Sequence, residues 1–230
     1  MGLLAKVPDG KSFDPIPEGV YVAVAYAIYD IGTQHNKFYD KHIRQVLIAW
    51  ELPDCRSEFE REGKMMNLPR AISQKYTLSL HMKAQLRKDL EAWRGAAFTK
   101  DELAGFDLKN ILGAACQLQV IHNQSKDGTK VYANIKALMA LPKGVMRPKA
   151  ENPLKWFSFD EALTEELPED MPAWIAEIIH ESAEWKERKH ASDLIPESSN
   201  ELPEDDPAIA NPPADFDAAS GEPDFSDLPF

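Results

Sequence analysis

The chain has 230 residues and a formal net charge of −12, which suits one domain with appendages and, as a whole-chain average, argues against a nucleic-acid partner because phosphates repel acidic proteins. Its two cysteines, Cys55 and Cys116, match no paired metal-ligand spacing, so neither a disulfide framework nor a zinc site is expected. The sequence has no apolar run of about eighteen residues, and its N-terminus lacks the apolar stretch of a signal peptide, which predicts a soluble protein of the cytoplasm.

Three strands are predicted before the first helix. Residues 1–14 show no periodicity and are expected to form a flexible arm. The segment GVYVAVAYAIYDIG is rich in β-branched and aromatic residues, and a period of two places on one face Val20, Val22, Val24, Tyr26 and Ile28. A second strand is predicted over Lys41–Leu52 and a third over residues 70–79, with PDCRSEFEREGK as a polar connection between them.

The period of the apolar residues changes after residue 79. A helix is predicted from the spacing of Leu80, Ala84, Leu86, Leu90 and Trp93, with Gly95 where a C-cap belongs. Thr99 and Glu102 have the spacing of a capping box, which predicts short helical turns. Strands return in ACQLQVIHN and KVYANIKALMAL, and the Asp-Gly pair between them is a strong hairpin signal.

Five strands with a helix between the third and the fourth is the order of an OB-fold barrel. We therefore expect an all-β to α+β chain with a five-stranded OB domain over residues 15–145 and with Trp50 and Trp93 in its core.

A linker and an amphipathic helical extension are predicted over residues 146–196. The linker, PKGVMRPKAENP, contains prolines and positive charges. One helical stripe is formed by Met171, Trp174, Ile175, Ile178, Ile179 and Trp185, with Asp170 as a cap candidate and Pro172 in the first turn. This stripe needs a surface to pack against, either the barrel or a second protomer in a homodimer. Residues 197–230 have no periodic apolar face, and their composition predicts a disordered acidic tail.

The charge is divided unevenly along the chain. Residues 197–230 hold ten acidic and no basic residues, and residues 151–196 hold twelve acidic and four basic ones. Residues 1–150 hold twenty-two basic against sixteen acidic residues, so the body is basic. A basic body can attract phosphate despite the average, and an acidic tail can compete with a nucleic acid for the same groove.

The chain ends on DFSDLPF, an apolar tip after a run of acidic residues. The tail as a whole can be a solubiliser, but Phe230 offers a ring and a carboxylate together, and a partner's pocket with Arg or Lys at its mouth would hold both. We expect a partner-binding tip formed by Asp224, Phe225, Asp227, Leu228, Pro229 and Phe230.

This tip resembles that of bacterial single-stranded-DNA-binding proteins, in which acidic residues precede a hydrophobe, Pro and a terminal Phe. With DIGTQ, a strand ending in IAWELP, then YTLSLHMKAQLRKDLEAWRG and YANIKALMALPKG, the chain resembles phage-encoded single-stranded-DNA-binding proteins over about residues 15–160 and the tip. The resemblance implies a protein that coats and protects single-stranded DNA without sequence preference, in phage replication or recombination in the cytoplasm of a bacterial host. It implies that the tail recruits replication or recombination proteins.

In an OB barrel the nucleic acid lies on the outer surface of strands 2 and 3, between the loops that join strands 1 to 2 and 4 to 5. Cations there bind phosphate and rings stack on bases, each stacked base contributing about 1–3 kcal/mol. The candidate DNA-binding residues are Lys37, Phe38, Tyr39, Lys41, Arg44, Arg70, Lys75, Lys126, Lys130, Tyr132 and Lys136. Two alternatives stay open, because the rings of the first loop can pack on the barrel rim and lysines on the fifth strand can protect a sheet edge.

Two other functions are weighed against DNA binding. The chain can be a protein-interaction adaptor with an OB scaffold and an acidic tail, since OB barrels also bind proteins. It can be a metal-dependent nuclease, if the fold gathers His35, Asp40, His42 and Glu51. No metalloprotease-type or phosphate-loop spacing is present, so we expect neither catalysis nor a cofactor.

Overall fold

The computed structural model describes residues 14–36, 40–61, 63–125, 127–161 and 166–193. The predicted N-terminal arm, apart from Asp14, and the acidic tail with its tip lie outside these residues. The strands are β1 (Gly19–Asn36), β2 (Lys41–Arg61), β3 (Lys64–Thr77), β4 (Ala115–Gln124), β5 (Val131–Met139) and β6 (Lys155–Phe157). The helices are α1 (Gln85–Arg94), α2 (Lys100–Ala104), the 3-10 helix η1 (Leu108–Ile111), α3 (Ala173–His180) and α4 (Ala183–Asp193).

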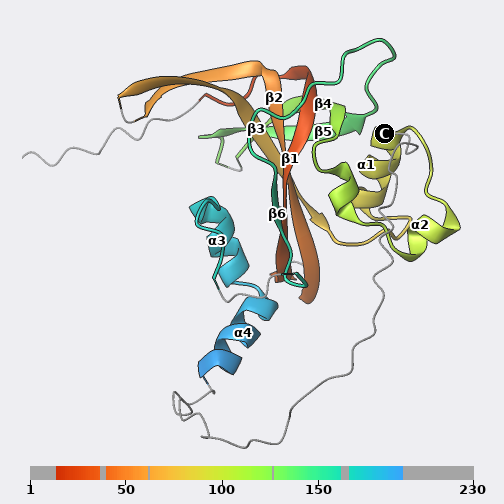
Figure 1. The fold of residues 1–230 in the computed structure, drawn as a ribbon, viewed down its shortest axis with the longest axis vertical. Helices are drawn as coiled ribbons and strands as arrows, with labels where there is room; N and C mark the ends of the chain where they lie inside the picture. Colours follow the sequence, from red (N-terminus) through yellow and green to blue (C-terminus); the bar gives the residue numbers. More distant parts are fainter. Residues whose placement is uncertain (1–13, 37–39, 62, 126, 162–165, 194–230) are drawn as a thin grey trace, which may run out of the picture.

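Strand β1 organises a curled sheet with the strand order β3-β2-β1-β4-β5 (Figure 1). Its first part, Gly19–Val24, pairs with β4, and from Val24 onward it pairs with β2. Two bulges, at Ala25/Ala27 and Asp30/Gly32, interrupt its register with β2, and bulges of this kind bend a strand. The resulting half-barrel of five strands, with α1 between β3 and β4, is compatible with an OB-like barrel.

The predicted polar connection between strands 2 and 3 is wrong, because both strands continue through it. Their pairing runs from Gln45↔Thr77 to Arg61↔Lys64, with a bulge between Leu52 and Arg56. This two-stranded arm extends away from the rest of the sheet (Figure 1). Half-buried Ser57 and Phe59 alternate with exposed charged residues there, a period of two that the high polarity of the segment obscured.

The first core lies inside the curled sheet and is closed by α1. Buried side chains include Ile28, Trp50, Leu86, Leu90, Trp93 and Leu118. Helix α1 ends as predicted, with Gly95 at φ 69° as its C-cap, and both halves of the Thr99–Glu102 capping box are formed. The face predicted for β1 is partly wrong, because Val20 is exposed and Ala23 and Ala25 point into this core. The bulge after Ala25 then returns Ile28 to the same side.

The C-terminal extension packs on the outer face of the sheet and forms a second core. This core joins β1 and β2 to β6, α3 and α4 through Ala27, Tyr29, Ile31, Leu47, Ala49, Phe157, Phe159, Met171, Ile175, Ile179 and Trp185. Strand β6 adds to the edge of β1 at Ala27–Tyr29. Five of the six stripe residues therefore pack on the chain's own sheet, and the sixth, Trp174, is 47% exposed.

The predicted single helix of the extension is two helices with a break at Ser182. The Ser182 hydroxyl donates to the Ile179 carbonyl (2.6 Å) and accepts from the Trp185 N–H (3.2 Å). Asp170 is not the cap, since Pro172 takes that position and the Asp170 carboxylate pairs with Lys155 at 2.9 Å. Within the described residues, no helix combines the length and the apolar character needed to cross a bilayer.

Candidate nucleic-acid interface

The DIGTQ segment, residues 30–34, fastens the extension to the barrel. Thr33 donates to the Glu184 carboxylate from both its backbone N–H and its hydroxyl, each at 2.6 Å. The Gln34 side chain donates to the Ile178 carbonyl at 2.9 Å. Gly32, at φ 69°, lies against Ser182 and Phe159. This motif, which contributed to the resemblance with DNA-binding proteins, thus has a structural role.

The contact between Glu184 and Thr33 predicts a pH dependence. Burial acts to raise the pKa of Glu184, but the hydrogen bonds from Thr33 outweigh it, so the pKa lies below its ordinary 4.5. A carboxyl group with a depressed pKa stabilises the fold above its unfolded pKa, and this stabilisation is lost as the pH falls through the folded value. Glu184→Gln should therefore lower the melting temperature at pH 7, and the difference from wild type should shrink below about pH 4.5. A difference that stays constant from pH 7 to pH 3 would contradict this account.

The extension covers part of the surface on which DNA was expected. Leu47 and Ala49 of β2 point outward but are buried beneath the extension. Their partners on β3, Lys75 and Ser73, lie on the same side of the sheet, and Lys75 is exposed. Of the predicted groove on strands 2 and 3, the outer face of β2 is thus covered at Leu47 and Ala49, and Lys75 on the β3 side remains open.

Two of the predicted phosphate-binding arginines are engaged in the fold. Arg44 donates to Asp30 (2.6 Å) and Asp160 (3.1 Å), and the bond to Asp30 is the main cause that raises its pKa. Arg70 donates to the Asp14 carbonyl. Exposed positions are found for Lys41, Lys75, Lys130, Tyr132 and Lys136. Outside the described residues lie Lys37, Phe38, Tyr39 and Lys126, together with the tip residues from Asp224 to Phe230.

A long stretch in which every charged residue is basic follows β5 and the loop after it. Residues 128–150 contain five basic and no acidic residues. These five, called the basic strip from here on, are Lys130, Lys136, Lys143, Arg147 and Lys149, and all are exposed. Among the described residues, none of the five forms an ion pair. The sequence analysis missed the last three, although the absence of acidic residues from 128 to 150 was a visible signal.

Tyr132 is the exposed ring of the basic strip. It is 51% exposed and pairs across the ladder with Asn123 of β4, which is also exposed. Gln119 of β4 pairs with Ala137, and the next residue, Val120, pairs with Ile135. Lys136 therefore lies in a register shift of the ladder. The strand therefore presents a ring flanked by two lysines to solvent.

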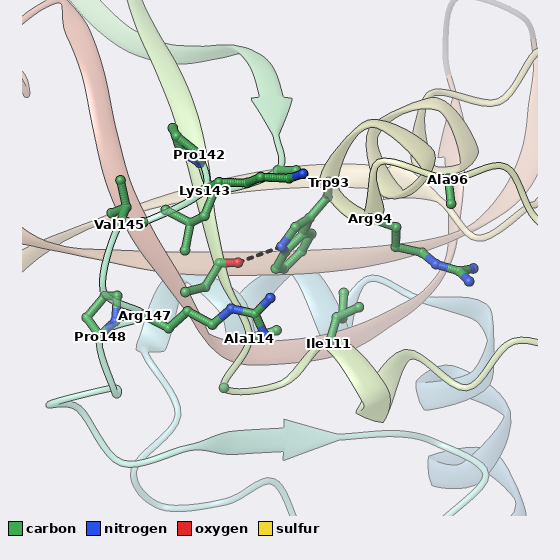
Figure 2. A pocket seen from close by; sticks show the side chains of 15 residues that line it. Trp93, Arg94, Ala96, Ile111, Ala114, Pro142, Lys143, Val145, Arg147 and Pro148 are labelled. Carbon is green, nitrogen blue, oxygen red and sulfur yellow. Dashed lines mark hydrogen bonds between the residues drawn. The ribbon is translucent and has the colours of Figure 1, made fainter. Parts of the chain in front are cut away.

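A cavity of about 590 Å³ lies where β5 ends, between the end of α1 and the loop that carries the basic strip (Figure 2). Its lining includes Trp93, Ile111, Leu141, Lys143, Val145 and Arg147. The Trp93 indole donates to the Ala115 carbonyl at 2.9 Å, which fixes the ring against the sheet. Figure 2 shows Lys143 and Arg147 reaching toward Trp93 from opposite sides.

Of the four residues weighed for a nuclease, His35, Asp40 and His42 lie close together, and Glu51 lies apart from them. His35 pairs with Asp40 at 2.8 Å, and its ring lies 5.0 Å from that of His42. Glu51 lies nine residues beyond His42 on β2, which is about 30 Å of strand, and it is fully buried. Across the described ranges, no group of three or more potential metal ligands is found.

Comparison of the chain with protein-family models, with curated proteins and with solved structures finds no match.

Proposed function

We propose that the chain binds single-stranded DNA without sequence preference, through the basic strip and Tyr132. The observation that carries this proposal is the run of five exposed basic residues between Asp127 and Glu151, with no acidic residue among them, along and after a strand of an OB-like sheet. Lysines that only protect a sheet edge would be confined to β5, whereas three of the five cations lie beyond it in the loop. This extension favours a phosphate-binding role.

Binding would combine phosphate contacts with base stacking. The nine residues of β5 span about 30 Å of extended chain, long enough to follow several nucleotides. The outward side chains near the strip are mostly cations, an aromatic ring and amides. Cations contact the phosphate backbone and a ring stacks on the face of any base, so neither contact depends on the base sequence. Lys75 on β3 and Lys41 at the start of β2 are exposed and would add contacts.

The same proposal includes a role in phage DNA replication or recombination in a bacterial host. In this role the protein coats and protects single strands, and its C-terminal tip around Phe230 recruits replication or recombination enzymes. No turnover is part of this function. The acidic tail would compete with DNA for the basic strip when no strand is bound.

The test is a titration of a labelled oligo-dT strand, followed by fluorescence anisotropy at several salt concentrations. The five contacts of the basic strip alone predict a slope of log K against log salt of about −3.5, because each contact on a single strand contributes about −0.7, and contacts of Lys41 and Lys75 would make the slope steeper. Tyr132→Ala should weaken binding by about 1–3 kcal/mol, the contribution of one stacked base. Trp174→Ala is the matched control, since Trp174 is an exposed ring (47%) on α3 and not on β5 or the loop after it.

Failure of the proposal is clear in this experiment. Absence of oligo-dT binding at low salt, both for the full chain and for a variant without residues 194–230, would leave the adaptor function as the better one. Displacement of oligo-dT by duplex DNA of equal length at equal concentration would refute the preference for single strands.

A further inference from the structure

The cavity beside Trp93 differs from the rest of the basic strip because its lining combines cations with apolar side chains. Trp93, Ile111 and Leu141 are among the apolar residues of the lining, and the volume of about 590 Å³ lies in the range of small-molecule sites. None of the described residues that line it is acidic. Such a lining suits a ligand that is planar and apolar on one part and anionic on another.

The cations of the cavity are of two kinds. Arg94 belongs to the lining, but its guanidinium donates to Glu102 at 2.6 Å and lies 4.8 Å from the centre of the Phe98 ring. This engagement turns it away from Trp93 (Figure 2). Lys143 and Arg147 belong to the basic strip and reach toward Trp93 instead. They are the cations of the lining that can hold an anion beside the ring.

The cavity is also continuous with the proposed path of the DNA. It opens where β5 ends, and residues 140–148 contribute eight of its fifteen lining residues. A strand that follows Lys130, Tyr132 and Lys136 along β5 would reach the cavity next. Its phosphates would then meet Lys143 and Arg147.

We propose that this cavity takes one nucleotide of the bound strand, with the base against the apolar lining near Trp93 and the adjoining phosphates bound by Lys143 and Arg147. This inference rests on the proposed DNA binding and adds a specific subsite to it. The lining side chains are chiefly Ala, Pro, Leu, Ile, Val and Trp besides the cations, so the site would accept any base that fits. It would lie outside the surface of strands 2 and 3, which the extension partly covers.

The first test separates the base from the phosphate. Ala140→Phe places a ring in the cavity from an exposed lining position, and Ala97→Phe is the control, on an exposed residue outside the lining. Binding of oligo-dT should fall about tenfold in Ala140→Phe, whereas binding of an all-abasic strand of the same length should not change. Ala97→Phe should bind both strands as the wild type does.

The second test concerns the charges. Lys143→Ala with Arg147→Ala should lower the salt slope by about 1.4, since two contacts on a single strand are lost. The matched control, Lys88→Ala with Lys100→Ala, removes two exposed cations outside the cavity and should leave the slope unchanged. Photocrosslinking of an oligonucleotide that carries 4-thiothymidine should label the peptide of residues 140–148.

The outcomes distinguish this inference from the function on which it rests. If the full chain does not bind oligo-dT, both fail. If it binds with a steep salt slope but Ala140→Phe and the Lys143/Arg147 double variant behave like their controls, only the cavity site is refuted. The site is also refuted if a DFSDLPF peptide binds the wild type and is lost in these variants while oligo-dT binding is unchanged, because the cavity would then hold the chain's own tip.

Discussion

Gly32→Ala should release the C-terminal extension from the barrel. Gly32 has φ 69°, a conformation in which a side chain is strained. A Cβ atom there would lie 2.6 Å from Cβ of Ser182, 2.7 Å from Oε2 of Glu184 and 2.9 Å from Cε2 of Phe159. All three contacts belong to the extension, so the clash falls on the interface between β1 and the two helices.

The expected cost has two parts. The left-handed backbone costs about 1–2 kcal/mol for a residue with a Cβ atom, and overpacking a filled site typically costs about 1–3 kcal/mol. Together they predict a loss of about 2–5 kcal/mol in the docking of the extension. Trypsin should then cleave after Lys186 in α4 much faster in the variant than in the wild type.

Gly128→Ala provides the control for backbone strain alone. Gly128 has φ 71°, but no atom lies within 4 Å of the position of its Cβ. This variant should lose about 1–2 kcal/mol and keep its extension protected from trypsin. Equal cleavage rates in the two variants would show that the contacts of Gly32 with the extension do not hold it in place.

The sequence predicted the elements that carry strong local signals. The helix ending at Gly95, the Thr99–Glu102 capping box and the hairpin at Asp127-Gly128 depend on neighbouring residues, and the structure has each of them. The face of β1 could not be predicted in the same way. Bulges at Ala25/Ala27 and Asp30/Gly32 change which residues point inward, and a bulge depends on the partner strand rather than on a local pattern.

The candidate site was predicted less well than the fold because charge alone does not reveal its partner. Arg44 looked available for phosphate, but Asp160, which is 116 residues away in sequence, completes its ion pairs. The sequence did not show which surface the apolar stripe around Ile175 packs against. That surface is the outer face of β1 and β2, more than 100 residues earlier in the chain. The positive charge of residues 128–150 is visible in the sequence. The predicted DNA-binding residues followed the OB pattern of strands 2 and 3 and their loops, and therefore did not include Lys143 and Arg147.

The loop that carries the basic strip is anchored at its far end by a buried carboxylate, Glu51. This side chain is fully buried, and it accepts hydrogen bonds from the backbone N–H groups of Glu151 (2.6 Å) and Asn152 (2.9 Å) and from the Asn152 side-chain amide (2.6 Å). Arg56 adds a two-bond contact with the Glu151 carboxylate. Strand β6 begins three residues after Asn152, so the anchor also sets its register.

Glu51→Ala should lower the free energy of unfolding by about 3–5 kcal/mol, because the donors that satisfied a buried charge would be left without an acceptor. Glu51→Gln keeps the size of the side chain, but its amide NH₂ group would face the N–H donors of Glu151 and Asn152. An intermediate loss in the free energy of unfolding is expected. The control is Glu60→Ala, on the exposed part of the same strand, which should change stability by less than about 0.5 kcal/mol. Urea unfolding measures all three variants.

The same variants connect stability with DNA binding. Since the Glu51 anchor holds the end of the loop that bears Lys143 and Arg147, Glu51→Gln should weaken oligo-dT binding without removing any cation. Phosphate contacts depend on charge and stacking depends on a fixed ring, so the loss should be larger for oligo-dT than for an all-abasic strand. An Ala variant within 1 kcal/mol of wild type, or equal losses for the two strands, would show that this anchor does not organise the loop.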